Sequence, residues 1–302
     1  MWKAKVWGIA ALLTGMSAAR SAIVILALVT ALAPEAQAGL VYAVGSDRSV
    51  TPYREGVYVL YAENVTASLL FETPEVTQRG DVWMGAAESL TGDGFYASGD
   101  ANLYWIDLVG LQAVLIGPFT SPEGALRLRE LALDAATGVL YGTDYTYLYE
   151  VNPATAAATA VGPHNPGLTN MNMWAMAYDP ATGELVGVAH RQVSPPGVTP
   201  RLFEADTYRI SPTTGAATLV GPTGQERITD LWYDCASGGM YGIGNFPGLL
   251  YSLDVATGAA TQIGSPGADM SLMGSATILP EPATLALLAL GGMGALLRRR
   301  GR

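Results

Sequence analysis

Lysine is almost absent from this 302-residue chain, because Lys3 and Lys5 are its only two lysines. Residues 39–279 carry nine arginines against 24 acidic residues, a net charge of −15. A nucleic-acid backbone is bound through clustered Lys and Arg, so this acidic segment argues against nucleic acid as a partner. The lack of lysine also excludes a P-loop and Schiff-base catalysis within residues 39–279.

Cysteine and histidine are also scarce. Cys235 is the only cysteine, which excludes an intrachain disulfide and a Cys-rich zinc site, and we expect an inert thiol. His164 and His190 are the only histidines, and neither has a partner at zinc-ligand spacing. We expect both to be solvated loop residues. No Gly-x-Ser-x-Gly nucleophile motif or dinucleotide glycine fingerprint stands at a strand-to-helix junction. The sequence therefore predicts no catalytic residues, no metal site, no cofactor and no enzymatic activity.

The N-terminus has the pattern of a secretory signal peptide. Arg20 precedes an apolar run over residues 22–32, and Ala36-Gln37-Ala38 then gives the small-x-small cleavage pattern. Residues 1–38 are thus predicted to engage the Sec translocon and to be cut by signal peptidase after Ala38. Met16 is an alternative start, because residues 16–38 alone form a well-proportioned signal peptide. An N-terminal membrane anchor remains the other interpretation.

The C-terminus combines three parts in a fixed order. Pro280-Glu281-Pro282 is followed by an apolar stretch over residues 283–297 and then by four arginines, Arg298, Arg299, Arg300 and Arg302. An apolar helix of 15 residues before a basic stop suits a temporary anchor better than a permanent span. Residues 280–302 resemble the PEP-CTERM sorting signal of Gram-negative bacteria. The resemblance implies processing by an exosortase, a transient anchor in the inner membrane, and export to the cell surface or an exopolysaccharide matrix.

Between the two ends the sequence repeats a strand–turn–strand phrase. Copies occur at residues 131–142, 177–187 and 232–242, and a degenerate copy at 86–97. An acid followed three residues later by Thr-Gly or Ser-Gly marks the turn of the three better copies. Asp at the first turn position can accept backbone amides, and Gly supplies the left-handed conformation of a short hairpin. Each copy therefore predicts a β-hairpin.

A second phrase follows each copy of the first. It has a tyrosine at its second position (Tyr104, Tyr149, Tyr208 and Tyr251) and continues through a turn into another apolar strand. Gly-Pro closes three copies, at Gly117, Gly162 and Gly221, and Gly264-Ser-Pro closes the fourth. Each repeat thus holds two hairpins, or four short strands, in about 40–50 residues, which is the signature of a propeller blade.

The predicted fold is an all-β propeller over residues 39–279, between an N-terminal signal helix and a C-terminal hydrophobic helix. Residues 40–72 resemble a blade without its first strand, and residues 272–279 could supply that strand and so close the ring with both ends of the chain. The count is five four-stranded blades, with six as the alternative. The repeat resembles bacterial YncE-like or quinoprotein-like propellers, although no cofactor signature accompanies it.

Most chemistry-bearing side chains of the body repeat with the blades. The turn acids Asp134, Asp179, Asp234 and Asp254 are interpreted as structural, because they stand at equivalent turns. Trp83 and Trp174, each eight residues before a threonine, are taken as equivalent, and together with the repeated tyrosines they predict inter-blade packing. The nearest approach to a calcium loop is the group Asp93, Asp100 and Asn102.

Departures from the repeat are the candidate ligand-binding residues, because loops carry specificity on repeat scaffolds. They comprise the Pro-rich insertion over residues 191–201 and aromatic residues of other loops, which gives the set His190, Arg191, Arg201, Tyr145, Tyr147 and Phe246. We expect an exported, non-enzymatic binding or structural module associated with exopolysaccharide. A propeller-type glycoside hydrolase or polysaccharide lyase is one alternative, and a calcium-stabilised adhesin is another.

Overall fold

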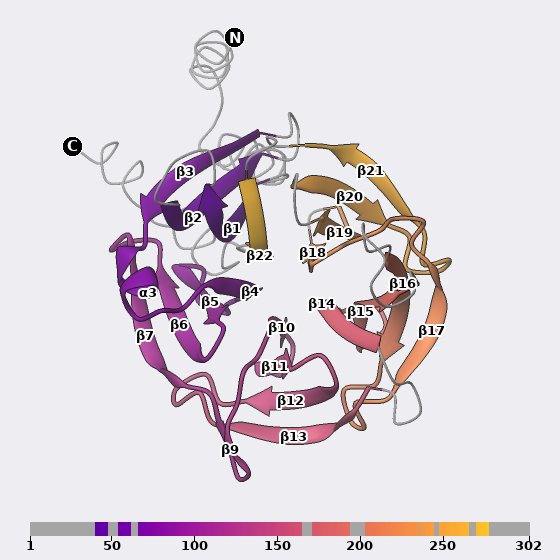
Figure 1. Cartoon of the computed structure of the whole chain (residues 1–302), viewed down its shortest axis with the longest axis horizontal. Coiled ribbons are helices and arrows are strands. Elements are labelled where there is room, and N and C mark those ends of the chain that lie inside the picture. The colour runs from indigo at the N-terminus through magenta and orange to yellow at the C-terminus, as the bar shows by residue number, and fades with distance from the viewer. Residues whose placement is uncertain are drawn as a thin grey trace, which may run out of the picture. The chain divides into compact units, whose positions relative to one another are not determined.

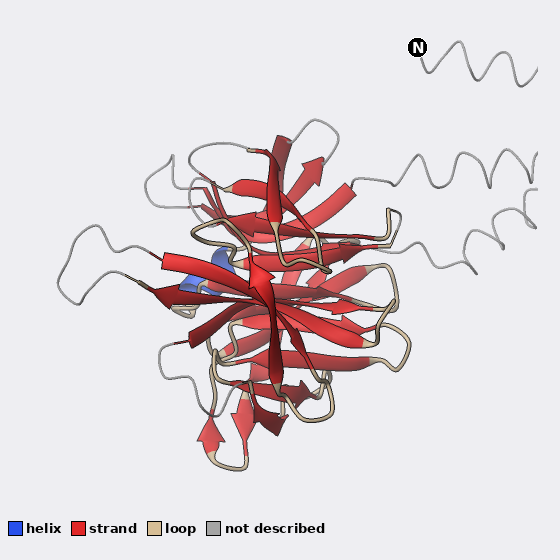
Figure 2. Ribbon diagram, turned by 90° about the vertical axis from the view of Figure 1, so that its right-hand side faces the viewer, coloured by secondary structure: helices blue, strands red, loops and turns tan. Residues whose placement is uncertain are grey.

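The computed structural model describes residues 40–47, 54–61, 66–164, 171–193, 203–235, 237–244, 248–265 and 270–277. They all belong to one compact unit, residues 39–279, and form a ring of antiparallel sheets (Figure 1). Figure 2 shows that nearly all the regular structure is strand. The helix α3 (Pro74–Gln78) is short, and no helix of the described residues is long and apolar enough to cross a membrane. The predicted signal peptide and sorting segment lie outside the described residues.

Five four-stranded sheets confirm the predicted propeller and its blade count. We number the blades along the chain and give each from its innermost to its outermost strand. Blade 1 is β22 (Met270–Thr277), β1 (Leu40–Asp47), β2 (Arg54–Tyr61) and β3 (Thr66–Glu72). Blade 2 is β4 (Trp83–Glu88), β5 (Gly94–Gly99), β6 (Asn102–Asp107) and β7 (Gln112–Pro118). Blade 3 is β10 (Glu130–Asp134), β11 (Val139–Thr143), β12 (Tyr147–Val151) and β13 (Ala158–Pro163). Blade 4 is β14 (Met171–Asp179), β15 (Glu184–Gln192), β16 (Phe203–Ile210) and β17 (Ala217–Pro222). Blade 5 is β18 (Asp230–Asp234), β19 (Gly239–Gly244), β20 (Leu249–Leu253) and β21 (Ala260–Gly264). A small hairpin, β8 (Thr120–Ser121) and β9 (Gly124–Ala125), lies between blades 2 and 3.

The ring is closed by strands from the two ends of the described chain. β22 pairs antiparallel with β1, from Val41 opposite Thr277 to Asp47 opposite Met270. The last strand therefore becomes the innermost strand of the first blade, as residues 272–279 predicted. Closure matters because an open ring would leave the unpaired edge of β1 exposed.

The repeated turns form as their sequences predict. In the β10–β11 turn, Asp134 Oδ1 accepts the amide of Ala136 at 2.9 Å, and its Oδ2 accepts the hydroxyl of Thr137 at 2.6 Å. Asp179 and Asp254 do the same in their own turns. Gly138 closes the first of these turns with φ = +77°, a conformation that glycine adopts without steric cost. The turn acids are therefore structural.

The hydrophobic core consists of five clusters, one between each pair of neighbouring blades. The repeated tyrosine of each blade is buried in the cluster shared with the preceding blade, which confirms the predicted inter-blade packing; these residues are Tyr58, Tyr104, Tyr149, Tyr208 and Tyr251. Burial of such a ring contributes about 2 kcal/mol through the hydrophobic effect. The periodicity of the sequence is thus the periodicity of the inter-blade contacts.

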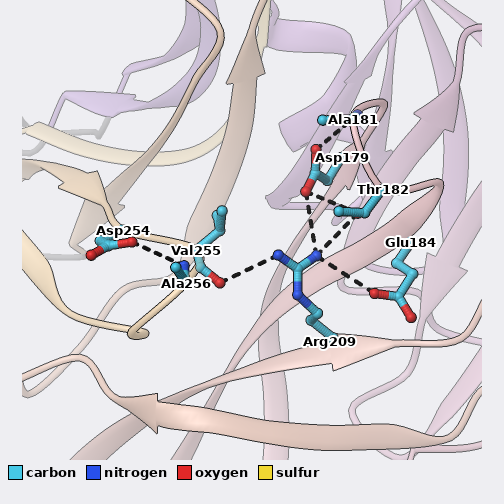
Figure 3. Close-up of polar contacts among 8 residues, drawn as sticks. All are labelled: Asp179, Ala181, Thr182, Glu184, Arg209, Asp254, Val255 and Ala256. Carbon is cyan, nitrogen blue, oxygen red and sulfur yellow. Dashed lines mark hydrogen bonds and ion pairs between the residues drawn. The ribbon is translucent and has the colours of Figure 1, made fainter.

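One arginine joins blades 4 and 5 near the rim (Figure 3). Arg209 Nη1 lies 3.3 Å from Asp179 Oδ2, 3.0 Å from Thr182 Oγ1 and 3.5 Å from Glu184 Oε2. Its Nη2 donates to the carbonyl oxygen of Val255 in the next blade at 3.4 Å. Arg209 therefore binds a turn of its own blade and a turn of the following blade.

Substitution of Arg209 by Gln tests this link. The Arg209 side chain is 25% exposed and that of Asp179 only 5%, so solvent screens this pair less than a surface ion pair. We expect a loss of about 1–2 kcal/mol in the free energy of unfolding, measured by urea denaturation. Arg191→Gln is the matched control, because Arg191 and Glu204 are 58% and 57% exposed. An equal loss in both variants would contradict a specific inter-blade role for Arg209.

Candidate functional site

Arginine is distributed unevenly between the two faces of the ring. We call the face where the inner strands begin, with the loops at residues 99–102 and 143–147, the top face, and the opposite one the bottom face. Of the seven arginines among the described residues, six lie at the top and only Arg209 at the bottom. Acidic residues of the described chain lie on both faces: nine at the bottom include the turn acids described above, and those at the top include Asp100 and Asp144. Apart from Arg209, the arginines of the described residues are thus confined to the top face.

Strand register places one residue of each blade at a common level of the axis. The repeated tyrosines pair through the second strands with Ser275, Ala86, Leu131, Met176 and Leu231 of the inner strands. The residues immediately before these form what we call the axial ring, which is Gly274, Gly85, Glu130, Ala175 and Asp230. Three of its five positions carry only Gly or Ala. A Cβ added to Gly85 would collide with Glu130 Oε1, so the small residues make room for the two acids.

The two acids of the axial ring face each other inside the protein. Glu130 and Asp230 are both 0% exposed and lie within hydrogen-bonding reach of each other. Glu130 Oε1 accepts the amides of Ala86 at 3.2 Å and Leu131 at 3.0 Å, and Asp230 Oδ2 accepts the hydroxyl of Ser275. Burial, and then the charge of Asp230, raise the pKa of Glu130 well above its usual range. Burial raises the pKa of Asp230 to about 7. This pair was missed by the sequence analysis.

We call the group of side chains one residue above the axial ring, toward the top face, the top mouth of the axis. Blades 2, 3 and 4 supply Met84, Arg129 and Trp174 at this level. Arg129 Nη1 lies 3.5 Å from the sulfur of Met84 and 2.9 Å from Asp100 Oδ1. Its guanidinium also lies 5.1 Å from the centre of the Tyr145 ring, which is a cation–π contact. Aromatic, cationic and thioether groups of three blades therefore meet at the mouth.

Tyr145 and Trp174 form the aromatic part of this mouth. Their ring centres are 4.9 Å apart at an interplanar angle of 50°, and both side chains are half-buried. Tyr145 has φ = +88°, which is costly for a residue with a large side chain. The amide of Met173 donates to the Tyr145 carbonyl at 3.0 Å and joins this loop to the inner strand of blade 4. Strain of this kind is typical of residues held in place for recognition.

The expectation that the histidines are solvated is wrong. His190 is buried, stacks on Trp174 with ring centres 5.6 Å apart, and places Nε2 2.8 Å from the Ile228 carbonyl oxygen. His164 Nδ1 lies 3.2 Å from the Gly215 carbonyl and must therefore donate, which leaves Nε2 to accept the Thr143 hydroxyl at 2.8 Å. Burial lowers the pKa of each histidine to about 4, so both are neutral at physiological pH. Both link neighbouring blades.

The predicted equivalence of Trp83 and Trp174 is wrong by one residue. Register matches Trp174 with Met84, at a bulge in each inner strand, and Trp83 with the buried Met173. The spacing to threonine misled because the β4–β5 turn is longer than the β14–β15 turn. Trp83 is a core residue, whereas Trp174 lies at the mouth.

The other predicted ligand residues are dispersed. Tyr147 is exposed on the top face beside Tyr149, and Arg191 forms its surface ion pair with Glu204. Arg201 and Phe246 lie outside the described residues. So do the predicted signal cleavage residues Ala36 and Ala38 and the sorting residues Pro280, Glu281 and Pro282. Of the six candidate ligand residues, the structure brings Tyr145 and His190 together, through Trp174.

The nearest calcium candidate does not form one site. Asp93 precedes β5 and Asp100 follows it, so the six residues of that strand separate them by about 20 Å. Asp100 accepts from Arg127 at 2.6 Å, while Asn102 donates to Asp81 at 2.6 Å. Among the described residues, no three His, Cys, Asp or Glu side chains are grouped to hold a metal ion.

Comparisons with known proteins agree with the fold and with the sorting segment. Residues 279–300 match the model of the PEP-CTERM protein-sorting motif. No curated protein matches the chain. A chain in the crystal structure of a nidogen/laminin complex is similar over 80% of this chain and 99% of its own, with 12% identity and a TM-score of 0.51. TolB from Acinetobacter baumannii is similar over 80% and 66%, with 10% identity and a TM-score of 0.44. At 12% identity, the likeness to the chain in the nidogen/laminin complex concerns the fold alone.

The sorting motif implies a secreted protein whose C-terminal membrane anchor is cleaved. The described residues supply the body that is exported. The chain is therefore an exported, exosortase-targeted protein that carries a PEP-CTERM sorting motif and a five-bladed β-propeller.

Proposed function

We propose that this propeller is a non-enzymatic module that binds exopolysaccharide at the top mouth of its axis, at the cell surface or in the extracellular matrix. The N-terminal segment would first direct it through the Sec translocon to signal peptidase. The observation that carries the proposal is the half-buried Tyr145–Trp174 pair beside Arg129. Aromatic rings with adjacent hydrogen-bond donors are natural platforms for a sugar ring, because one side of the contact is apolar and the other polar.

The position of the acids favours binding over catalysis. A glycosidase holds two carboxyl groups about 5–10 Å apart with the sugar between them. Glu130 and Asp230 converge on the axis, but they are in contact and neither is exposed. At the mouth itself, Asp100 is engaged by Arg127 and Arg129. A hydrolase or lyase would need a carboxyl group free to reach its substrate.

Trp174→Ala tests the proposal in the protein as the producing cells export it. Exopolysaccharide purified from the producing cells is the probe, and the dissociation constant is measured by isothermal titration calorimetry. We expect binding to weaken on the order of tenfold, as for loss of a central aromatic contact. Trp174→Phe keeps a ring and should lose less. Leu219→Ala, on the outer strand β17, is the surface control and should bind normally.

The same samples distinguish a binding module from an enzyme. Size-exclusion chromatography of the polysaccharide after incubation should show an unchanged polymer length. Shortening by the native protein would contradict the proposal. Equal binding by all variants would place the ligand elsewhere on the ring.

A further inference from the structure

We infer that Glu130 and Asp230 form a proton-sharing lock that holds the closing strand β22 in the ring. The first support is position. Glu130 lies on the inner strand of blade 3 and Asp230 on that of blade 5, and the Ser275 hydroxyl of β22 donates to Asp230. The cluster thus spans the axis and includes the strand that joins the two ends of the ring.

The second support is an incomplete set of hydrogen bonds. Glu130 Oε2 and Asp230 Oδ1 are buried and lack a donor among the described residues. A buried acceptor without a donor is costly. A proton held between two facing carboxyl groups supplies that donor and removes one of the two charges, as in other carboxyl pairs that cannot both ionise.

A bound cation fits the cluster less well. The side-chain oxygens that the hydrogen bonds bring together here are the two carboxyl groups and the Ser275 hydroxyl, and no third acidic, His or Cys side chain of the described structure joins them. Calcium takes six to eight oxygen ligands. A shared proton needs only two acceptors, and Glu130 Oε2 and Asp230 Oδ1, which lack a donor, provide them.

The surrounding charged groups do not neutralise the pair. The nearest cation in sequence is Arg129, whose guanidinium is held by Asp100 above the axial ring, and His190 is neutral and bound to Ile228. Among the side chains that the structure describes, the other titratable ones on strands packed against β10, β18 and β22 are Glu88, Asp134, Asp179, Asp234, Tyr42, Tyr96, Tyr141, Tyr178, Tyr233 and Tyr241. None of them is a cation.

A rise in pH should lower the free energy of unfolding through this pair. Carboxyl groups with raised pKa keep their protons in the folded protein when the unfolded chain has lost them, so their contribution is complete below about pH 4 and is lost as the pH rises. The two buried histidines act oppositely, but only below about pH 6.5, where the unfolded chain protonates them. From pH 6.5 to 8.5 the lock therefore dominates, together with Glu88, whose pKa burial raises to about 7.

The experiment uses the protein as the producing cells export it, with Glu88→Gln so that Glu88 does not titrate. Urea unfolding between pH 6.5 and 8.5 should show an unfolding equilibrium constant that rises by up to about tenfold per pH unit for each retained proton. Adding Glu130→Gln should remove most of this rise, because Gln cannot ionise and still donates to Asp230. Asp230→Asn should give the same result, and the two changes together should not add, because they remove one shared proton. Ser275→Ala is the control and should lower stability while keeping the rise.

Hydrogen exchange provides the second readout. In the protein with an intact pair, protection of the β22 amides, corrected for the intrinsic pH effect on exchange, should fall as the pH rises, and it should not fall with Glu130→Gln. An unchanged pH dependence in both amide variants would overturn the proposal. Stabilisation by calcium that disappears with Glu130→Gln would also overturn it, since a cation would then occupy the pair.

Discussion

Replacing residues 270–277 by an eight-residue Gly/Ser segment in the full chain is expected to abolish cooperative folding of the ring. β22 supplies Leu272 to the core between blades 5 and 1, and Ala276 to the core between blades 1 and 2. Its loss also exposes the edge of β1 and leaves Asp230 without the Ser275 hydroxyl. Because a domain has only about 5–15 kcal/mol of stability, a loss on the order of 5 kcal/mol or more should leave the ring open and prone to aggregate. Circular dichroism melting curves measure the loss of cooperative unfolding, and light scattering measures aggregation.

A matched replacement separates closure from a general effect of Gly/Ser sequence. Residues 121–124 belong to the β8–β9 hairpin outside the blades, and the same treatment there should shift the melting temperature only slightly. If both replacements were equally mild, ring closure by β22 would not be the source of the stability.

Alanine at Gly162 or Gly221 is expected to destabilise the protein by about 2–3 kcal/mol. These glycines close blades 3 and 4, and each packs against the turn of the next blade. A Cβ on Gly162 would collide with the carbonyl oxygen of Thr214, and one on Gly221 with that of Thr257. Neither glycine has a positive φ, so the cost is steric. Because the opposing atoms belong to the backbone, the clash is relieved only by moving one blade away from its neighbour.

Gly117→Ala is the control at the equivalent position of blade 2. A Cβ there would lie 3.4 Å from the Thr155 carbonyl oxygen and 4.0 Å from Ala156, which is ordinary contact. Urea denaturation should show a change below about 1 kcal/mol for this variant. A loss at Gly117 as large as at Gly162 would show that the Gly-Pro motif acts through its own strand and not through the next blade.

Much of the candidate site could have been found by aligning the repeats more closely. Glu130 and Asp230 each stand one residue before the Leu of the repeated phrase, where the other blades have Gly or Ala. An acid at two of the five equivalent positions of the inner strands would have indicated that acidic side chains meet at the axis. The residue equivalent to Trp174 in blade 2 could not be identified from the sequence, because bulges and turn lengths shift the register between blades.

The sequence by itself determined the C-terminal sorting segment, the four-stranded repeat, the turn chemistry and the strand that closes the ring, whereas the N-terminal signal peptide stays a prediction. The repeat and its turns are local, because hydrogen bonds and backbone preferences within a few residues specify each turn, and the same pattern recurs in each blade. The closing strand pairs with a distant one, but it could be identified because the repeat leaves one strand missing at the start and one left over at the end. Only the tertiary structure decided which residues meet at the axis. Glu130 and Asp230 are 100 residues apart in the chain, and their contact, burial and raised pKa values arise because closing the ring brings the inner strands together around them. Packing between neighbouring blades likewise buries the histidines that the sequence had placed in solvent.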